Sequence, residues 1–134
     1  MLVRATTEEA FRSAFDAATV ASQMALDPFI LDETSPGGFS LLLRDLDSYS
    51  AVFEARGHSG SGYSWEALAR AVVESSLVEV EDKIEFDSEA DTLCARSADR
   101  AALVKLGEIL VEAVRSPKQL KKLIEKVPPG LWDD

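Results

Sequence analysis

The run Phe39-Ser40-Leu41-Leu42-Leu43-Arg44 is the feature that most restricts the fold of this chain. It follows an extended run at 28–33 and the turn signal Thr34-Ser35-Pro36-Gly37-Gly38, so the two runs predict a β-hairpin. A strand with one face in solvent alternates apolar and polar residues, and three consecutive leucines do not fit that pattern. We therefore expect residues 38–44 to form a central strand that is covered on both sides.

Helical periodicity accounts for much of the remaining chain. A capping box at Thr6 and Glu9 opens a predicted amphipathic helix at 7–22. Asp47 is expected to cap a short helix that ends near Gly57, and Ser64 to cap the next one. Two more helices are predicted, one from about residue 98 to 114 and one that begins after a capping box at 116–119.

A second hairpin completes the predicted architecture. Residues 83–86 and 92–96 are expected to pair across the turn at 87–91. The order of helices and strands predicts a single α+β domain, with a mostly antiparallel sheet of short strands packed against helices.

The amino-acid composition excludes several classes of function. The 134 residues include 24 Asp and Glu against 14 Lys and Arg, a net charge of −10, which repels nucleic acid and favours a basic partner. The single Cys94 and the single His58 exclude a Cys/His zinc site and an internal disulfide. A free thiol and short apolar runs indicate a cytoplasmic protein without a membrane span, and no cofactor or metal is expected.

The loop Gly57-His58-Ser59-Gly60-Ser61-Gly62 resembles a phosphate-binding loop only superficially. It lacks the lysine of a P-loop, and it follows a helix instead of a strand. We therefore interpret Gly57, Gly60 and Gly62 as structural residues of a helix–loop–helix corner. Cys94, in a predicted strand, is interpreted as a small core residue and not as a nucleophile paired with His58. Ser59 and Ser61 near His58 give only a weak signal for a catalytic triad, because no orienting carboxylate is fixed by spacing.

Two aromatic residues follow this loop. Trp65 begins the apolar stripe of the predicted helix, so it is expected to be a core anchor. Tyr63 is expected to lie just outside the helix with its hydroxyl at the surface. The loop and this ring together also fit the rim of a binding site, and that interpretation stays open.

The densest charge lies at 79–91, where seven carboxylates face Lys83 alone. The segment lacks the glycine and flanking helices of a calcium loop. A solvated acidic hairpin is the simplest interpretation. The functional alternative is a docking surface that steers a basic partner.

Several local sequences resemble the immunity protein 51 family, whose members neutralise toxins encoded beside them. The similar segments are Ser40-Leu41-Leu42-Leu43-Arg44-Asp45, Gly57-His58-Ser59-Gly60-Ser61-Gly62-Tyr63-Ser64-Trp65-Glu66, Ile84-Glu85-Phe86-Asp87-Ser88-Glu89-Ala90 and the closing leucine-rich helices. The resemblance implies an immunity-protein domain at 27–134, with 1–26 as an added N-terminal helix.

The resemblance also implies a non-enzymatic inhibitor whose partner is a cognate toxin domain. Acidity favours a basic toxin, such as a nuclease whose cleft the inhibitor occludes. The oligomeric state is left open. The candidate toxin-binding residues are Asp45, Asp47, His58, Tyr63, Glu66, Glu79, Glu81, Asp82, Glu85, Asp87, Glu89 and Asp91.

A different class of function remains as the alternative. It is a small-ligand or phosphate-binding domain, with or without enzymatic activity, that uses the loop Gly57–Gly62. A cleft that holds His58 together with a carboxylate would favour this alternative. A convex acidic face at the same place would favour the inhibitor.

Overall fold

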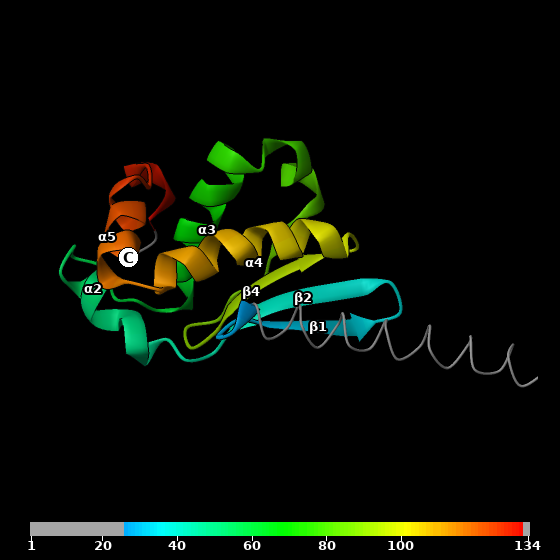
Figure 1. The fold of residues 1–134 in the computed structure, drawn as a ribbon, viewed down its shortest axis with the longest axis horizontal. Coiled ribbons are helices and arrows are strands. Elements are labelled where there is room, and N and C mark those ends of the chain that lie inside the picture. The colour runs from blue at the N-terminus through cyan, green and yellow to red at the C-terminus, as the bar shows by residue number, and fades with distance from the viewer. Residues whose placement is uncertain (1–25, 133–134) are drawn as a thin grey trace, which may run out of the picture.

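Four strands form one antiparallel sheet in the computed structural model, which describes residues 26–132 (Figure 1). The spatial order is β1-β2-β4-β3, and the strands are β1 (Ile30–Ser35), β2 (Gly38–Leu43), β3 (Glu85–Phe86) and β4 (Leu93–Ser97). Both predicted hairpins are confirmed, as is the single α+β domain. The predicted helix at 7–22 lies outside the described residues.

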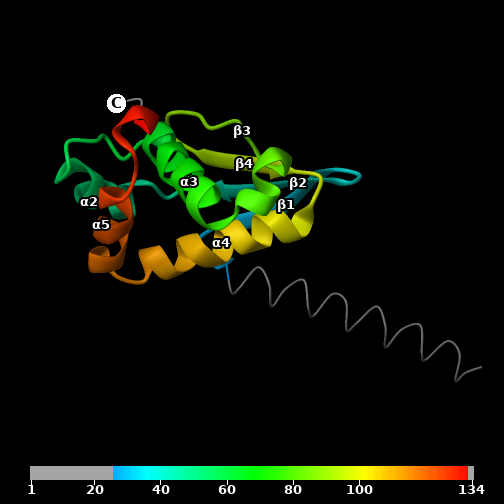
Figure 2. The ribbon, with the colours of Figure 1, turned by 90° about the horizontal axis from the view of Figure 1, so that it is seen from above.

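Helices pack on this sheet and at one end of it. Figures 1 and 2 show α3 and α4 on the same face of the sheet, with α2 and α5 beside each other at one end. The helical elements are η1 (Asp47–Tyr49), α2 (Ser50–Glu54), α3 (Gly62–Ser76), η2 (Val78–Lys83), α4 (Arg100–Val114), α5 (Pro117–Glu125) and η3 (Pro129–Leu131). None of the helices between residues 26 and 132 combines the length and apolar character of a membrane span.

Strand β2 lies between β1 and β4, which confirms its central position. Leu41 and Leu43 are fully buried on the face that the helices cover, where Leu41 approaches α4 at Gly107. Leu42 points to the opposite face and is only half-buried. Ser40 on this same face is 2% exposed, and Cys94, which pairs with Leu42, is 8% exposed. The covering of β2 on both sides stays a prediction.

The core is centred on an aromatic cluster around Trp65, which has no exposed surface. Its ring lies 5.2 Å from that of Phe53, 5.7 Å from that of Tyr49 and 6.0 Å from that of Phe29, centroid to centroid. Edge-to-face contacts of this kind add to the stabilisation from buried area. Trp65 thus joins the start of β1, α2 and α3, and its predicted role as a core anchor is confirmed.

Two predicted helix caps are wrong by a few residues. Asp45, not Asp47, holds the first turn of η1, because its carboxylate accepts hydrogen bonds from the backbone N–H of Ser48 at 3.4 Å and the hydroxyl of Ser48 at 2.6 Å. Ser61, not Ser64, caps α3, and its hydroxyl accepts the N–H of Ser64 at 3.3 Å. The predicted cap at Ser116 is confirmed.

Candidate functional site

The corner between α2 and α3 requires glycine because of backbone conformation at Gly57 and Gly60 and because of close packing at Gly60 and Gly62. Gly57 and Gly60 have φ angles of +83° and +78°, which favour glycine. A Cβ at Gly60 would also lie 2.9 Å from Cα of Ser50. A Cβ at Gly62 would lie 1.8 Å from the carbonyl oxygen of Glu89. All three glycines therefore have the structural role that the sequence predicts.

The loop at 87–92 rests on the first turns of α3. The backbone N–H of Gly62 donates to the carbonyl oxygen of Ala90 at 2.9 Å. The carboxylate of Glu66 accepts the N–H of Ser88 at 3.4 Å, and Arg70 lies over the ring of Phe86, 4.8 Å from its centroid. We call residues 57–66 and 87–92 together the corner joint.

The corner joint uses its own backbone amides. Gly60 N–H donates to the hydroxyl of Ser64 at 3.1 Å, and Ser61 N–H donates to the hydroxyl of Ser59 at 3.2 Å. With the N–H of Gly62 bonded to Ala90, three successive amides of the loop are occupied. A phosphate-binding loop needs such amides directed at its ligand. This arrangement disfavours the phosphate-binding alternative.

An acidic cleft of about 360 Å³ opens beside the corner joint. Four carboxylates line it against one guanidinium, which leaves a formal charge of −3. We call it the acidic cleft; its charged residues are Arg44, Asp45, Asp47, Glu54 and Asp91, and Ser59, Gly60 and Ser61 form part of its wall. The acidic surface at this place is therefore concave, where a convex one was expected to favour an inhibitor.

Negative charge around the acidic cleft also acts on Tyr49. The pKa of the Tyr49 phenol is raised above its ordinary value, first by burial and then by the charges of Asp45 and Asp27. Both effects penalise the phenolate. Of these two carboxylates, Asp45 lines the acidic cleft, so one cleft residue also acts on a ring of the aromatic cluster.

The acidic residues among the predicted site residues fall into three groups. Asp45, Asp47 and Asp91 meet in the acidic cleft. Glu66 is used within the corner joint, where it also accepts from Arg70 at 3.4 Å. The other acidic candidates are exposed and spread along η2, β3 and the loop after it: Glu79, Glu81, Asp82, Glu85, Asp87 and Glu89.

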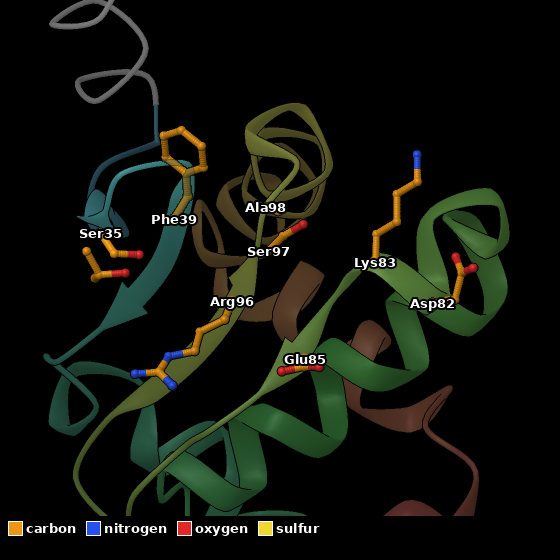
Figure 3. Close-up of a pocket in the computed structure, with 10 residues that line it drawn as sticks. Ser35, Phe39, Asp82, Lys83, Glu85, Arg96, Ser97 and Ala98 are labelled. Carbon is orange, nitrogen blue, oxygen red and sulfur yellow. The ribbon is translucent and has the colours of Figure 1, made fainter.

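A second hollow, of about 540 Å³, lies at the far end of the sheet (Figure 3). In Figure 3, Ser35 and Phe39 lie on its β1–β2 side, and Asp82 and Lys83 lie on its η2 side. Its two cations are already paired, Lys83 with Asp99 at 3.5 Å and Arg96 with Asp87 at 3.3 Å. This hollow carries charges of both signs and shows less preference for one class of partner than the acidic cleft.

His58 and Tyr63 lie outside the lining of the acidic cleft. The imidazole of His58 stacks on Trp132, with 3.7 Å between ring centroids and 16° between ring planes. His58 therefore does not meet a carboxylate in the cleft, as the ligand-binding alternative requires. Tyr63 belongs to the first turn of α3, not to the preceding loop as predicted, and the residue is 43% exposed.

Sequence reasoning missed Glu54 and Arg44, which complete the charged lining of the cleft. Glu54 follows Phe53 on the exposed side of α2, and Arg44 ends the leucine run of β2. Arg44 lies in one of the segments that resemble the family, but Glu54 lies in none of them. The helical count that places Phe53 inward does place Glu54 outward, which was the available signal.

Cys94 lies on β4 with 8% of its surface exposed. Burial raises the pKa of its thiol, although nearby Arg96 acts in the opposite direction. A buried thiol with a raised pKa is a poor nucleophile. No group of three or more His, Cys, Asp or Glu side chains within residues 26–132 is placed to hold a metal ion.

The model of a family described as immunity protein 51 matches residues 29–129, which include the whole sheet, the corner joint and the acidic cleft. Neither a curated protein nor a solved structure matches the chain. Because this match covers well over half of its length, the chain belongs to the immunity protein 51 family.

Proposed function

We propose that this protein neutralises its cognate toxin by binding a basic surface of the toxin through the acidic cleft. Membership of the family implies a toxin as partner. The observation that carries the assignment to this cleft is that Asp47 and Glu54, from the consecutive elements η1 and α2, meet Asp91, from the loop after β3, on one hollow. Complementary charge of this kind speeds association and selects the partner.

The three carboxylates are available to a partner. Asp47, Glu54 and Asp91 are exposed, and none of them forms an ion pair within residues 26–132. Asp45 is different, because it holds the first turn of η1. The exposed ring of Tyr63, two residues after Ser61 in the cleft wall, supplies the kind of aromatic contact that is enriched in interfaces.

Inhibition would follow from occlusion without chemistry by the inhibitor. The acidic cleft contains no histidine, cysteine or lysine, and its wall is fixed by the hydrogen bonds of the corner joint. A rigid acidic surface suits a toxin with a basic cleft, and a nuclease is the toxin class that needs one. In this proposal, the complex forms in the cytoplasm, where the toxin acts.

Co-expression with the toxin domain encoded beside this gene tests the function. We expect cells that produce both proteins to survive and the two proteins to purify as a complex. Survival should be lost when this chain is omitted. Cell death despite its soluble expression would contradict the proposed function.

A matched pair of variants tests the surface. Asp47→Lys/Glu54→Lys/Asp91→Lys should slow association roughly tenfold or more at low salt, because steering toward a basic toxin is lost. The control is Glu79→Lys/Glu81→Lys/Asp82→Lys, which changes the net charge equally but lies on and around η2. Equal association rates for the two variants would exclude the acidic cleft as the docking surface, even if protection persists.

A further inference from the structure

Strand β1 presents an unpaired edge in the described part of the chain. It pairs with β2 on one side only, and it forms an end of the β1-β2-β4-β3 sheet (Figure 1). The other end, β3, is only two residues long and continues into the loop that rests on α3. An edge strand of six residues, whose pairing with β2 is regular from Ile30 to Glu33 and shifts between Glu33 and Ser35, offers backbone donors and acceptors to another chain.

The start of β1 is held firmly while its later residues are open. Leu31 is 3% exposed, and Phe29, which precedes the strand, is 2% exposed. Residues 32–36 are all exposed. The strand is therefore fixed in position by its first residues, so that adding a neighbour would require little reordering.

Charge on β1 selects the kind of neighbour. In an antiparallel pair of two whole copies of this six-residue strand, Asp32 of one copy would lie opposite Glu33 of the other. Like charges directly opposite destabilise a strand pair, whereas opposite charges stabilise it. The edge thus resists a second copy of this chain and suits a strand that carries lysine or arginine.

We propose that an extended, basic segment of the toxin adds to β1 as a fifth strand of the sheet. This inference rests on the proposed function, since it concerns the same partner. The register connects the two surfaces: Ile30 of β1 pairs with Leu42, two residues before Arg44 in the acidic cleft. A toxin segment on β1 would therefore lie next to a toxin surface bound at the cleft.

Hydrogen exchange on the complex with the neighbouring toxin domain tests the added strand. In the free chain, the backbone N–H groups within residues 30–33 that point away from β2 should exchange fast. In the complex they should exchange at least roughly tenfold more slowly. Amides of β2, which are paired on both sides, serve as the internal reference. A complex in which β1 exchange is unchanged would overturn the added strand while leaving the proposed function intact. Failure to form any complex would instead contradict the proposed function, and the added strand with it.

Charge reversal on β1 provides the second measurement. Asp32→Lys/Glu33→Lys should weaken toxin binding roughly tenfold without changing the melting temperature, because both side chains are exposed. Glu79→Lys/Glu81→Lys is the control with the same charge change. Equal affinity of the two variants would overturn the charge argument. Light scattering of the free protein should show no pairing through β1, and a dimer with protected β1 amides would assign the edge to a second copy.

Discussion

The backbone N–H of Gly62 donates a 2.9 Å hydrogen bond to the carbonyl oxygen of Ala90, which joins the first turn of α3 to the loop after β3. This bond connects residues that are far apart in the sequence and brings Asp91 to the acidic cleft. The position of one charged cleft residue thus depends on an uncharged contact. The predictions below test this arrangement and the core behind it.

Gly62→Ala should lower the free energy of unfolding by about 1–3 kcal/mol, as expected for a substitution that overfills a packed site. The added Cβ would lie 1.8 Å from the carbonyl oxygen of Glu89 and 2.4 Å from that of Thr92, and both obstacles are backbone atoms. Urea unfolding measures the loss. Gly130→Ala is the control, because a Cβ there meets nothing within 4 Å. Similar stability of the two variants would show that the loop does not pack on α3 as described.

Asp45→Ala should cost about 1 kcal/mol of stability, whereas Asp47→Ala should stay within about 0.5 kcal/mol of the original chain. The carboxylate of Asp45 accepts two hydrogen bonds from Ser48, and the side chain of Asp47 caps no helix. Thermal or urea unfolding of the two variants compares them directly. A larger loss of stability in Asp47→Ala than in Asp45→Ala would show that Asp47, as first predicted, caps this helix.

Trp65→Ala should destabilise the fold by about 3–5 kcal/mol, because it removes the ring that three others contact. Trp65→Phe should cost less, since it keeps a ring and removes an indole N–H that lacks an acceptor within residues 26–132. Denaturant unfolding gives both values. A Trp65→Ala variant of normal stability that no longer binds toxin would move this residue from the core to the interface.

Alkaline pH should destabilise the protein, because the folded state raises the pKa of both Tyr49 and Cys94. The unfolded chain releases these protons at lower pH than the folded chain, so this part of the stability is complete below the ordinary pKa values. It is lost as pH rises through the folded values. Urea unfolding between about pH 8 and about pH 11 should show the decline, and Tyr49→Phe should make it shallower. If the free energy of unfolding of Tyr49→Phe falls with pH as steeply as that of the original chain, Tyr49 is excluded as a source of the alkaline destabilisation.

Local signals were sufficient to predict the sheet and the later helices. The turn at 34–38 and the leucine run predicted β1 and β2, and Ser116 with Pro117 predicted the start of α5. The choice between Ser61 and Ser64 was not local, because both serines precede the apolar stripe. The contact of Gly62 with the loop carbonyls places the first turn of α3 earlier, and Ser64 is then buried inside the helix.

The candidate site was predicted less well, for a related reason. The density of charge at 79–91 drew attention to one segment, but the fold distributes that segment over η2, β3 and a loop. Of the carboxylates in this segment, Asp91 alone lines the acidic cleft, where it meets Glu54 from α2. Nothing in the spacing of these two residues indicates that they share a cleft, since tertiary packing of the corner joint brings them together.

The residues of the corner joint that carry the resemblance to the family differ from the residues that we expect to select the toxin. The glycines, Ser61, Ser64 and Trp65 of the motif serve backbone packing, capping and the core. Asp47 and Glu54 lie outside that motif and carry no internal ion pair among the described residues. Substitution at positions such as Asp47 and Glu54 can therefore change which toxin the protein binds. The fold, and the sequence motif that carries the family resemblance, would stay the same.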